Sequence, residues 1–454
     1  MSKTIKLKKG FDINLVGKPQ EKIIESKQPE TYAIKPTDFV GISRPKLLVK
    51  EGDSVKAGSP VLFDKFTEQV KYCAPVSGKV VEIKRGEKRK LLEVKILADK
   101  SVEYVKHKKY STSDISKLSK EDAFEQMSAG GVWPNVIQRP YGIVADPESE
   151  PKAIFISAFD THPLAPNTAF ILQDQGAHFQ AGLDILKKFT SGKIHLNIKG
   201  GDEVAQIFSQ AKGVEINKFM GPHPSGNVGT QIHHLDPINK GDIAWTVSPY
   251  GVAQIGKLFT EGIYDASKIV ALTGSQVTDP AYVKTYSGAN AGNLLDGHLK
   301  SGPSRIISGN VLTGEAVGKE GFLGFYDQQF TVIPEGDYEE LLGWILPSTN
   351  KLSFHKAFGL LGFLNPKKEY VVDTNTHGEE RAFVMSGAFE KVMPMDIYPT
   401  FLFKAIMAED YDEMEGLGIY ELVEEDVALC EFIDVSKHPL QTILRSGLNL
   451  LKES

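Results

Sequence analysis

The chain has 454 residues, of which 41% are hydrophobic and 24% charged, and its formal net charge is -6. That length predicts roughly three domains of about 150 residues each. The composition is typical of a soluble globular protein, and the acidic balance argues against a nucleic-acid partner, which requires a basic face. Two cysteines, Cys73 and Cys430, exclude a disulfide scaffold and any iron–sulfur or zinc site built from four thiolates.

The sequence also predicts no segment that enters a membrane. It begins MSKTIKLKKG, where lysines precede no apolar run, so we expect no signal peptide. The longest apolar stretches (AIFISAF, LLGWIL and FGLLGFL) are shorter than the ~20 residues of a membrane-spanning helix.

Residues 30–100 alternate short apolar runs with turn signals such as Glu51-Gly52-Asp53. This pattern predicts that the N-terminal region, 1–110, contains a barrel-sandwich β domain like those that carry biotin or lipoate on a lysine. In such carriers the lysine stands on a tight hairpin, a fixed distance before an Ala-Pro pair. Counting back from Ala74-Pro75 leads to Thr67, and Lys65 stands two residues too early. Because threonine has no amine to acylate, we expect an unmodified scaffold or docking module.

A basic run at 84–90, KRGEKRK, follows within this region. A solvated loop is one interpretation of the run. The other is a surface that docks on a partner protein or on anionic headgroups.

From about residue 111 apolar strands alternate with helical segments. A helix is expected at 120–127, with Ser119 as its N-cap and Asp122 in the capping-box position. Strands are expected at 153–159, 193–199, 214–219 and 242–247, with helices at 175–190, 203–211 and 250–259. Such alternation predicts a parallel sheet covered on both faces, here a Rossmann-like α/β domain at 111–265.

The remaining chain divides into two parts. Strands and glycine turns return in KIVALTG, YVKTYSGANAGN, RIISGNVLTG and QQFTVIP, which predicts a β-grasp (SLBB-like) domain at 266–336. Segments such as DYEELLGWIL, PTFLFKAIMAED and VEEDVALCEFI have helical periodicity, which predicts a helical C-terminal domain at 337–454.

Gly130-Gly131, in MSAGGVWPNVIQRP at 127–140, precede the first strand of the α/β domain. Adjacent glycines would let the backbone approach a phosphate or a flavin ring. Two glycines make a weak motif, and on motif strength alone an ordinary turn before a strand is the favoured interpretation.

Three histidines gather at His223, His233 and His234, with Asp236 nearby. Zinc requires three or four converging ligands. In an extended segment His233 and His234 point in opposite directions, so we expect loop or core histidines and no metal site.

Several long motifs occur in a recognisable order, namely KKGFDINLVGKP (8–19), APVSGKVVEIKRGEKR (74–89), SAFDTHPLAPN (157–167), GPHPSGNVGT (221–230), RIISGNVLTG (305–314), LGWILP (342–347) and EKVMPMDIYPT (390–400). Through them the chain resembles, nearly end to end, the NqrA family, which supplies one of the subunits of the Na⁺-translocating NADH:quinone reductases. That family is in turn similar to the flavin-carrying subunit of complex I and to the RnfC protein of the Rnf complex.

Relative to those flavoproteins, the chain departs at the residues that hold prosthetic groups. Their flavin loop is rich in glycine, whereas this chain has Ala129-Gly130-Gly131-Val132-Trp133-Pro134, and Trp133 would occupy the place of the flavin ring. Of their several cluster-binding cysteines, only Cys430 remains. The resemblance therefore implies a subunit with no catalytic residue, no flavin and no iron–sulfur cluster of its own.

The resemblance also implies a peripheral subunit on the cytoplasmic face of the bacterial inner membrane, in contact with the membrane through partner subunits. The complex uses NADH, flavins and quinone, and exports Na⁺. A quinone or other cleft ligand would contact Gly130, Gly131, Trp133, Pro134, His162 and His223. The alternative is a freestanding flavin- or NAD-binding oxidoreductase that uses the Gly130-Gly131 loop. We also expect that the substitution Gly131→Trp leaves the fold stable.

Overall fold

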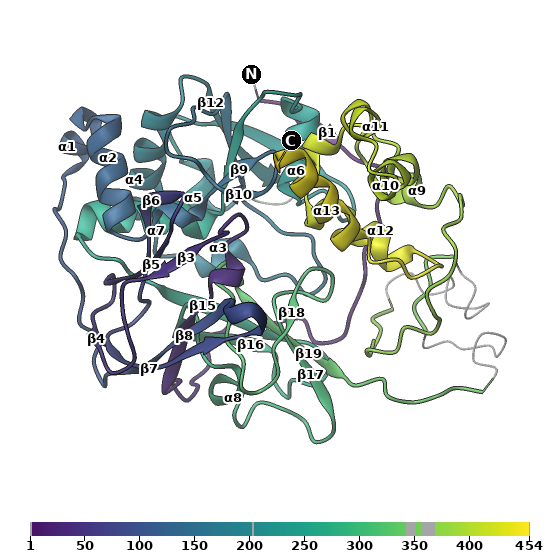
Figure 1. The fold of residues 1–454 in the computed structure, drawn as a ribbon, viewed down its shortest axis with the longest axis horizontal. Helices are drawn as coiled ribbons and strands as arrows, with labels where there is room; N and C mark the ends of the chain where they lie inside the picture. The colour runs from purple at the N-terminus through teal and green to yellow at the C-terminus, as the bar shows by residue number, and fades with distance from the viewer. Residues whose placement is uncertain (1, 202–203, 342–350, 356–367, 454) are drawn as a thin grey trace.

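The computed structural model describes residues 2–201, 204–341, 351–355 and 368–453. A small β sandwich, a large α/β sheet, a second β sheet and a group of C-terminal helices follow one another along the chain (Figure 1). Within the described residues, none of the helices combines the length and the apolar character needed to cross a bilayer.

Seven strands between residues 31 and 98 form the β sandwich. They are β2 (Thr31–Ile34), β3 (Pro45–Leu47), β4 (Ser54–Val55), β5 (Pro60–Asp64), β6 (Thr67–Cys73), β7 (Gly78–Arg85) and β8 (Leu91–Ala98). Two sheets, with strand orders β2-β8-β7-β4 and β3-β5-β6, share one core. The predicted sandwich is confirmed, because Val61 and Val70 of one sheet and Val80 and Val94 of the other belong to the same buried cluster.

The hairpin between β5 and β6 differs from the prediction in one respect. Asp64 pairs with Thr67, so the two-residue tip consists of Lys65 and Phe66. Asp64 is buried and accepts hydrogen bonds from the backbone amides of Ser43, Arg44 and Phe66, which fixes the turn. Counting back from the Ala-Pro pair therefore misplaced the tip, and an exposed lysine does stand there.

The central α/β sheet has seven strands in the order β1-β13-β12-β11-β14-β9-β10. These are β1 (Thr4–Lys6), β9 (Val136–Arg139), β10 (Ile143–Val144), β11 (Ala153–Ser157), β12 (Lys193–Lys199), β13 (Glu215–Met220) and β14 (Ala244–Val247). The first five in spatial order run parallel, and β9 and β10 add an antiparallel edge. Thus β1, at the start of the chain, belongs to a sheet whose other strands lie between residues 136 and 247.

The two faces of this sheet pack against different helices. Side chains of a strand alternate between faces. Accordingly Ile154 and Ile156 of β11 join the cluster with α4 (Gly176–Leu186) and α7 (Pro249–Glu261). Ala153 and Phe155 join the cluster with α6 (Val228–Leu235) and the C-terminal helices. The sheet is therefore covered on both faces, as predicted.

The remaining helices and 3₁₀ turns in the first half of the chain are short. They are α1 (Thr112–Lys117), α2 (Lys120–Ala129), α3 (Thr168–Ile171), α5 (Gln206–Ser209) and the 3₁₀ turns η1 (Pro36–Asp38), η2 (Glu87–Arg89), η3 (Trp133–Asn135) and η4 (Lys187–Phe189). The N-cap of α2 is confirmed, since the Ser119 hydroxyl accepts a hydrogen bond from the Asp122 amide at 3.0 Å. The helix expected at 203–211 is reduced to α5.

The second β sheet has five strands in the order β16-β15-β19-β17-β18. They are β15 (Ser267–Thr273), β16 (Ala281–Tyr286), β17 (Ser304–Ser308), β18 (Glu315–Ala316) and β19 (Gln329–Pro334), with the short helix α8 (Ala291–Leu294) between β16 and β17. All four strand segments expected in this stretch are present.

The C-terminal part consists of α9 (Phe389–Val392), α10 (Pro399–Met407), α11 (Tyr411–Gly416), η6 (Ile419–Glu421), α12 (Glu424–Ile433) and α13 (Leu440–Glu453). The helices expected in PTFLFKAIMAED and VEEDVALCEFI are α10 and α12. Residues 337–341 of the expected DYEELLGWIL helix are not helical, and the rest of that segment lies outside the described residues.

Candidate functional site

The Gly130-Gly131 turn follows α2 and is filled by side chains of the chain itself. A Cβ on Gly130 would lie 2.5 Å from a methyl carbon of Leu258, and one on Gly131 would lie 2.6 Å from the Cβ of Cys73. Gly131 also has a φ of +71°, which L side chains rarely adopt. The glycines thus allow close packing between α2, β6 and α7. A side chain at position 131 would have to displace Cys73, which contradicts the expectation that Gly131→Trp is tolerated.

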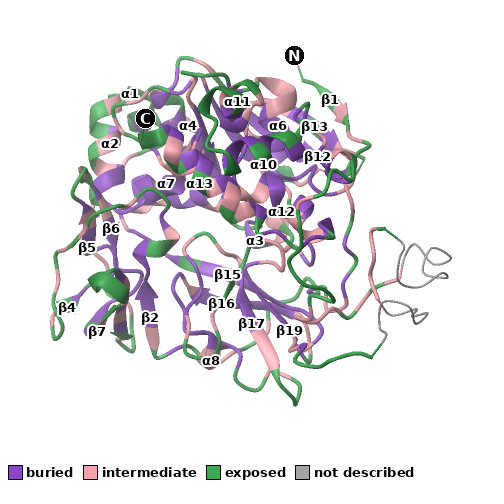
Figure 2. Ribbon diagram, turned by 45° about the vertical axis from the view of Figure 1, so that its right-hand side comes forward, coloured by how far each residue is buried: buried purple, intermediate pink, exposed green. Residues whose placement is uncertain are grey.

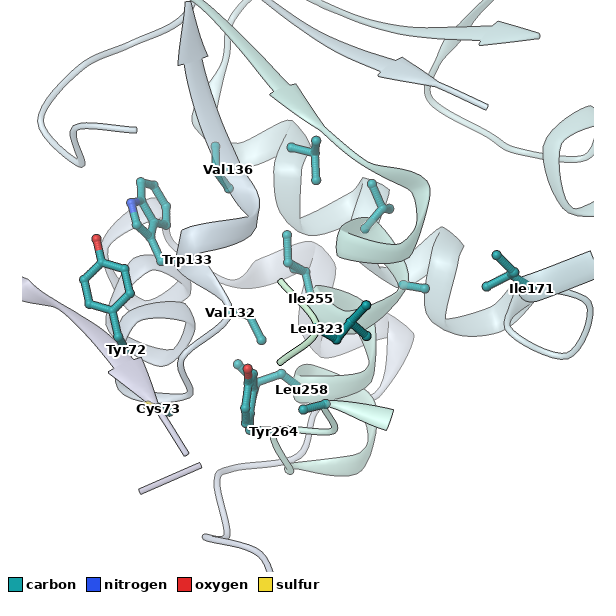
Figure 3. Packing of buried hydrophobic residues seen from close by; sticks show 14 of the residues in the cluster. Tyr72, Cys73, Val132, Trp133, Val136, Ile171, Ile255, Leu258, Tyr264 and Leu323 are labelled. Atoms are coloured by element: carbon teal, nitrogen blue, oxygen red, sulfur yellow. The ribbon is translucent and has the colours of Figure 1, made fainter. Parts of the chain in front are cut away.

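Trp133 and Pro134 belong to the hydrophobic core (Figure 3). The Trp133 side chain has no exposed surface, and its ring lies 5.3 Å from that of Phe189 and 5.5 Å from that of Trp245, centroid to centroid. Its Nε1 donates a hydrogen bond to the carbonyl of Ala145 at 2.9 Å. Buried tryptophans usually find such a partner. The four residues Gly130, Gly131, Trp133 and Pro134 are therefore in the packed interior, away from His162 and His223.

His162 and His223 do lie together, at the carboxyl edge of the central sheet. His162 follows β11 and His223 follows β13, and the two ring centroids are 4.8 Å apart. From β11 the chain continues to β12 and β13 on one side, and it returns to β14 on the other side. The carboxyl end of a strand at such a reversal is where open α/β sheets commonly bind ligands.

Neighbouring polar groups hold the two imidazoles in place. Nδ1 of His162 lies 2.5 Å from Oδ1 of Asp160, and Nδ1 of His223 lies 3.1 Å from the hydroxyl of Thr161. The backbone amide of His223 donates to Asp12 at 2.8 Å, which connects the N-terminal segment to this edge. We name Asp160, Thr161, His162 and His223 the histidine cluster.

The charges in the histidine cluster are strongly coupled. Burial lowers the pKa of His223 to about 3, and the proximity of His162 adds to this. Burial also disfavours the charged form of His162, but the attraction of Asp160 outweighs it and raises the pKa of His162. Burial alone would raise the pKa of Asp160, whereas His162 lowers it to about 2. These shifts place the positive charge of the cluster on His162, next to Asp160, in preference to His223.

The cluster and its surroundings contain several buried polar atoms without a protein partner. Nε2 of His162 and Nε2 of His223 are two of them, and Oδ1 of Asn227, Oγ1 of Thr230 and Oδ1 of Asp426 are three others. Asn227 and Asp426 are neighbours through α12, because the Asn227 side chain donates to the carbonyl of Glu425 at 2.9 Å. Buried polar groups that lack a partner are candidates for contact with a ligand or ordered water.

His233 and His234, in contrast, form no site. Both lie in the last turn of α6, so the assumption of an extended segment is wrong, and their rings are 5.2 Å apart. His233 Nδ1 lies 2.8 Å from a carboxylate oxygen of Glu421, and His234 Nδ1 lies 2.9 Å from the carbonyl oxygen of Thr230. Among the described residues there is no group of three or more metal-binding side chains.

A cavity of about 210 Å³ lies between α7 and the strands β15 and β16. Lys268 and Tyr250 line it, and burial lowers the pKa of the Lys268 amine to about 8. That amine already donates to the carbonyls of Phe325 (2.5 Å) and Asp327 (2.9 Å). The sequence offered no signal for this cavity, because Lys268 is the second residue of β15, which otherwise has the pattern of an ordinary apolar strand.

Comparisons with known proteins cover nearly the whole chain. Residues 5–99 match the family model described as the NqrA N-terminal barrel-sandwich hybrid domain, residues 118–264 the NqrA second alpha/beta domain, and residues 269–319 the NQRA C-terminal domain. The chain resembles only weakly a solved NAD⁺-reducing [NiFe]-hydrogenase, at 12% identity and a TM-score of 0.38 over 78% of this chain and 67% of that one.

Curated relatives match over their full length. A protein of Yersinia pestis bv. Antiqua (strain Angola), named as the NqrA subunit of the Na(+)-translocating NADH-quinone reductase, is 39% identical over 450 residues, covering 99% of both chains. Proteins of the same name from Serratia proteamaculans (strain 568) and Vibrio parahaemolyticus serotype O3:K6 are 38% identical, again over 99% of both chains. The chain therefore belongs to the NqrA family of the Na⁺-translocating NADH-quinone reductases.

Proposed function

We propose that this chain is a non-catalytic, peripheral subunit of a Na⁺-translocating NADH:quinone reductase, held at the cytoplasmic face of the inner membrane by its partner subunits. The observation that carries the proposal is the end-to-end similarity to relatives of that name. Within this proposal the central sheet is a Rossmann-like layer and the chain binds neither flavin nor an iron–sulfur cluster.

The packing of the Gly130-Gly131 turn supports the absence of a flavin there. Both glycines are buried, and Leu258 and Cys73 pack directly against them. The alternative, a freestanding flavin- or NAD-binding oxidoreductase, depended on that turn and is not favoured.

Purification from solubilised membranes tests the proposed function. A tagged chain should retain the other reductase subunits, and the preparation should catalyse Na⁺-dependent quinone reduction by NADH. The chain purified alone should be colourless and should not oxidise NADH. A lone chain that is yellow and turns over NADH would contradict the proposal.

We further propose that the quinone head group contacts this chain at the histidine cluster. An imidazole Nε2–H can donate to a quinone carbonyl, and both Nε2 atoms are buried without a protein partner. Binding sites for small molecules combine a few such polar groups with apolar walls, and buried Leu164 and Phe155 lie in the apolar cluster on this side of the sheet.

Binding of ubiquinone-1 to the full chain tests this contact. Replacing both histidines, His162→Leu with His223→Leu, removes two potential donors and should weaken binding at least about tenfold, a loss typical of two hydrogen bonds. The matched control is His178→Leu, at a half-buried histidine on α4 whose Nδ1 lies 2.9 Å from the hydroxyl of Thr260. Equal affinity in wild type and double variant would refute the contact while leaving the proposed place in the complex intact.

A further inference from the structure

Helix α10 presents apolar side chains on both of its sides. Leu402 and Phe403 are buried in the cluster shared with the central sheet. On the outer side Tyr398 is 60% exposed, Phe401 49% and Met407 56%. A surface helix normally carries polar residues on its outer face, so the solvent-facing side of α10 has the composition of a covered surface.

The apolar stripe continues across the turn into α11. Tyr411, the first residue of α11, is 40% exposed, and α10 and α11 contact each other. We name Tyr398, Phe401, Met407 and Tyr411 the outer helical face. Figure 2 shows exposed stretches on α10 and α11 at the top of the molecule. Four large apolar side chains are exposed within 14 residues, and the rings of Tyr398 and Phe401 contact each other, whereas isolated exposed side chains need no explanation.

Acidic side chains border this patch. They are Glu409, Asp410, Asp412 and Glu413, all exposed, and Lys404 is the exposed cation within α10. Asp410 caps α11 by accepting a hydrogen bond from the Glu413 amide at 3.1 Å. Carboxylates at a helix start stabilise the helix, but they also give this end of the molecule a negative surface.

We propose that the outer helical face docks a segment of another subunit in which apolar side chains alternate with lysine or arginine. This inference rests on the proposed function, since it requires a partner within the complex. Complementary charge selects such a segment: its cations would meet the acidic border, and its apolar side chains would cover Tyr398 and Phe401. The aromatic pair, with ring centroids 6.4 Å apart, is of the kind that dominates binding energy at interfaces.

The acidic border also argues against two other occupants. An anionic lipid surface would be repelled by four carboxylates. The basic run of a second copy, KRGEKRK at 84–90 on the hairpin of β7 and β8, has no apolar side chain that could cover the outer helical face.

The test uses the complete membrane complex with a tag on this chain. The variant Tyr398→Ser/Phe401→Ser should reduce the amount of co-purifying subunits at least about tenfold, as expected when two aromatic anchors are lost. The variant Glu409→Lys/Asp412→Lys should reduce it more at low than at high ionic strength, because surface charges are screened by salt. The matched control is Phe66→Ser, at the 66% exposed tip of the β5–β6 hairpin, which should leave assembly unchanged.

Two further measurements, the unfolding of the variants and the self-association of the wild-type chain, distinguish the possible explanations of the result. Unfolding of the full-length variants should match wild type, which shows that the loss is in binding. If wild type retains no other protein of the complex, the proposed function fails. If wild type retains its partners and the aromatic variant does so equally well, the docking inference alone is refuted. A wild-type chain that self-associates through these aromatics would refute it in favour of a second copy.

Discussion

The guanidinium of Arg139 donates a hydrogen bond at 2.8 Å to the carboxylate of Asp426, across 287 residues of sequence. Arg139 ends β9 at the edge of the central sheet, and Asp426 lies in the first turn of α12. Both side chains are almost fully buried, and Glu425 accepts a second hydrogen bond from the same guanidinium at 2.7 Å. This buried ion pair stabilises the contact between the C-terminal helices and the central sheet, beside the histidine cluster.

Removing the charge of Asp426 should therefore destabilise the chain. Asp426→Asn keeps the shape of the side chain but leaves Arg139 with one carboxylate, and breaking a buried pair typically costs about 3 kcal/mol. The measurement is the free energy of unfolding in urea. As a control, Asp279→Asn breaks the exposed pair with Lys22 and should cost less than about 1 kcal/mol. Equal effects of the two substitutions would contradict the role of the buried pair.

Gly131→Ala should destabilise the chain more than the same substitution at Gly213. Both glycines have similar positive φ angles, +71° and +76°, so alanine meets comparable backbone strain at either position. At Gly213 a Cβ would have nothing within 4 Å, whereas at Gly131 it would meet Cys73 at 2.6 Å. Overpacking costs about 1–3 kcal/mol beyond the strain. Urea unfolding of both variants measures the difference, and identical losses would show that the turn has room for a side chain.

The histidine cluster predicts a pH dependence of stability. Because the folded state lowers the pKa of His223 to about 3, the unfolded chain binds more protons between pH 6.5 and that value. Stability should thus fall as the pH falls through this window, by at most about 1.4 kcal/mol per pH unit. In His223→Gln the free energy of unfolding in urea should therefore fall less between pH 7 and pH 5 than it does in wild type.

His162 predicts the opposite sign. Its raised pKa means that its contribution is complete below pH 6.5 and is lost as the pH rises past that value. In His162→Gln the free energy of unfolding should accordingly fall less as the pH rises above 6.5 than it does in wild type. If neither variant changes the pH dependence of the free energy of unfolding, the two imidazoles do not titrate as the structure indicates.

Both thiols should be inert in the folded chain. Cys73 and Cys430 are buried, and burial raises the pKa of Cys73 to about 12 and also raises that of Cys430. Since the thiolate is the reactive form, a disulfide reagent should label neither thiol at pH 7 and both after unfolding in urea. Rapid labelling of the native chain would show that the packing around Cys73 and the Gly131 turn is open.

The sequence predicted a strand or a helix end correctly where the residues of that segment alone determine it. The strand expected at 193–199 is β12 (Lys193–Lys199), residue for residue, because its alternating apolar residues Ile194, Leu196 and Ile198 fill one face of the sheet. Ser119 caps α2 because a hydroxyl at that place satisfies a free amide of the helix whatever surrounds it.

Predictions failed where a residue's role depends on distant partners. Gly131 was interpreted as freedom for a ligand, yet its neighbour is Cys73, 58 residues earlier in the sequence. The argument that His233 and His234 point in opposite directions assumed an extended segment, but both lie in α6, where Ile232 packs against the C-terminal helices. The first strand, β1, pairs with β13, more than 200 residues away, and no local pattern indicates such a pairing.

The amino-acid sequence by itself determined the family, the succession of β and α/β regions and most of the strands, since these follow from periodicity and motifs read over a few neighbouring residues. The tertiary structure alone decided that Gly130 to Pro134 are interior, that His162 and His223 come together, and that Arg139 meets Asp426. The physical reason is that these outcomes depend on contacts between segments far apart in the chain, where packing and buried charge select one arrangement from many that local preferences allow.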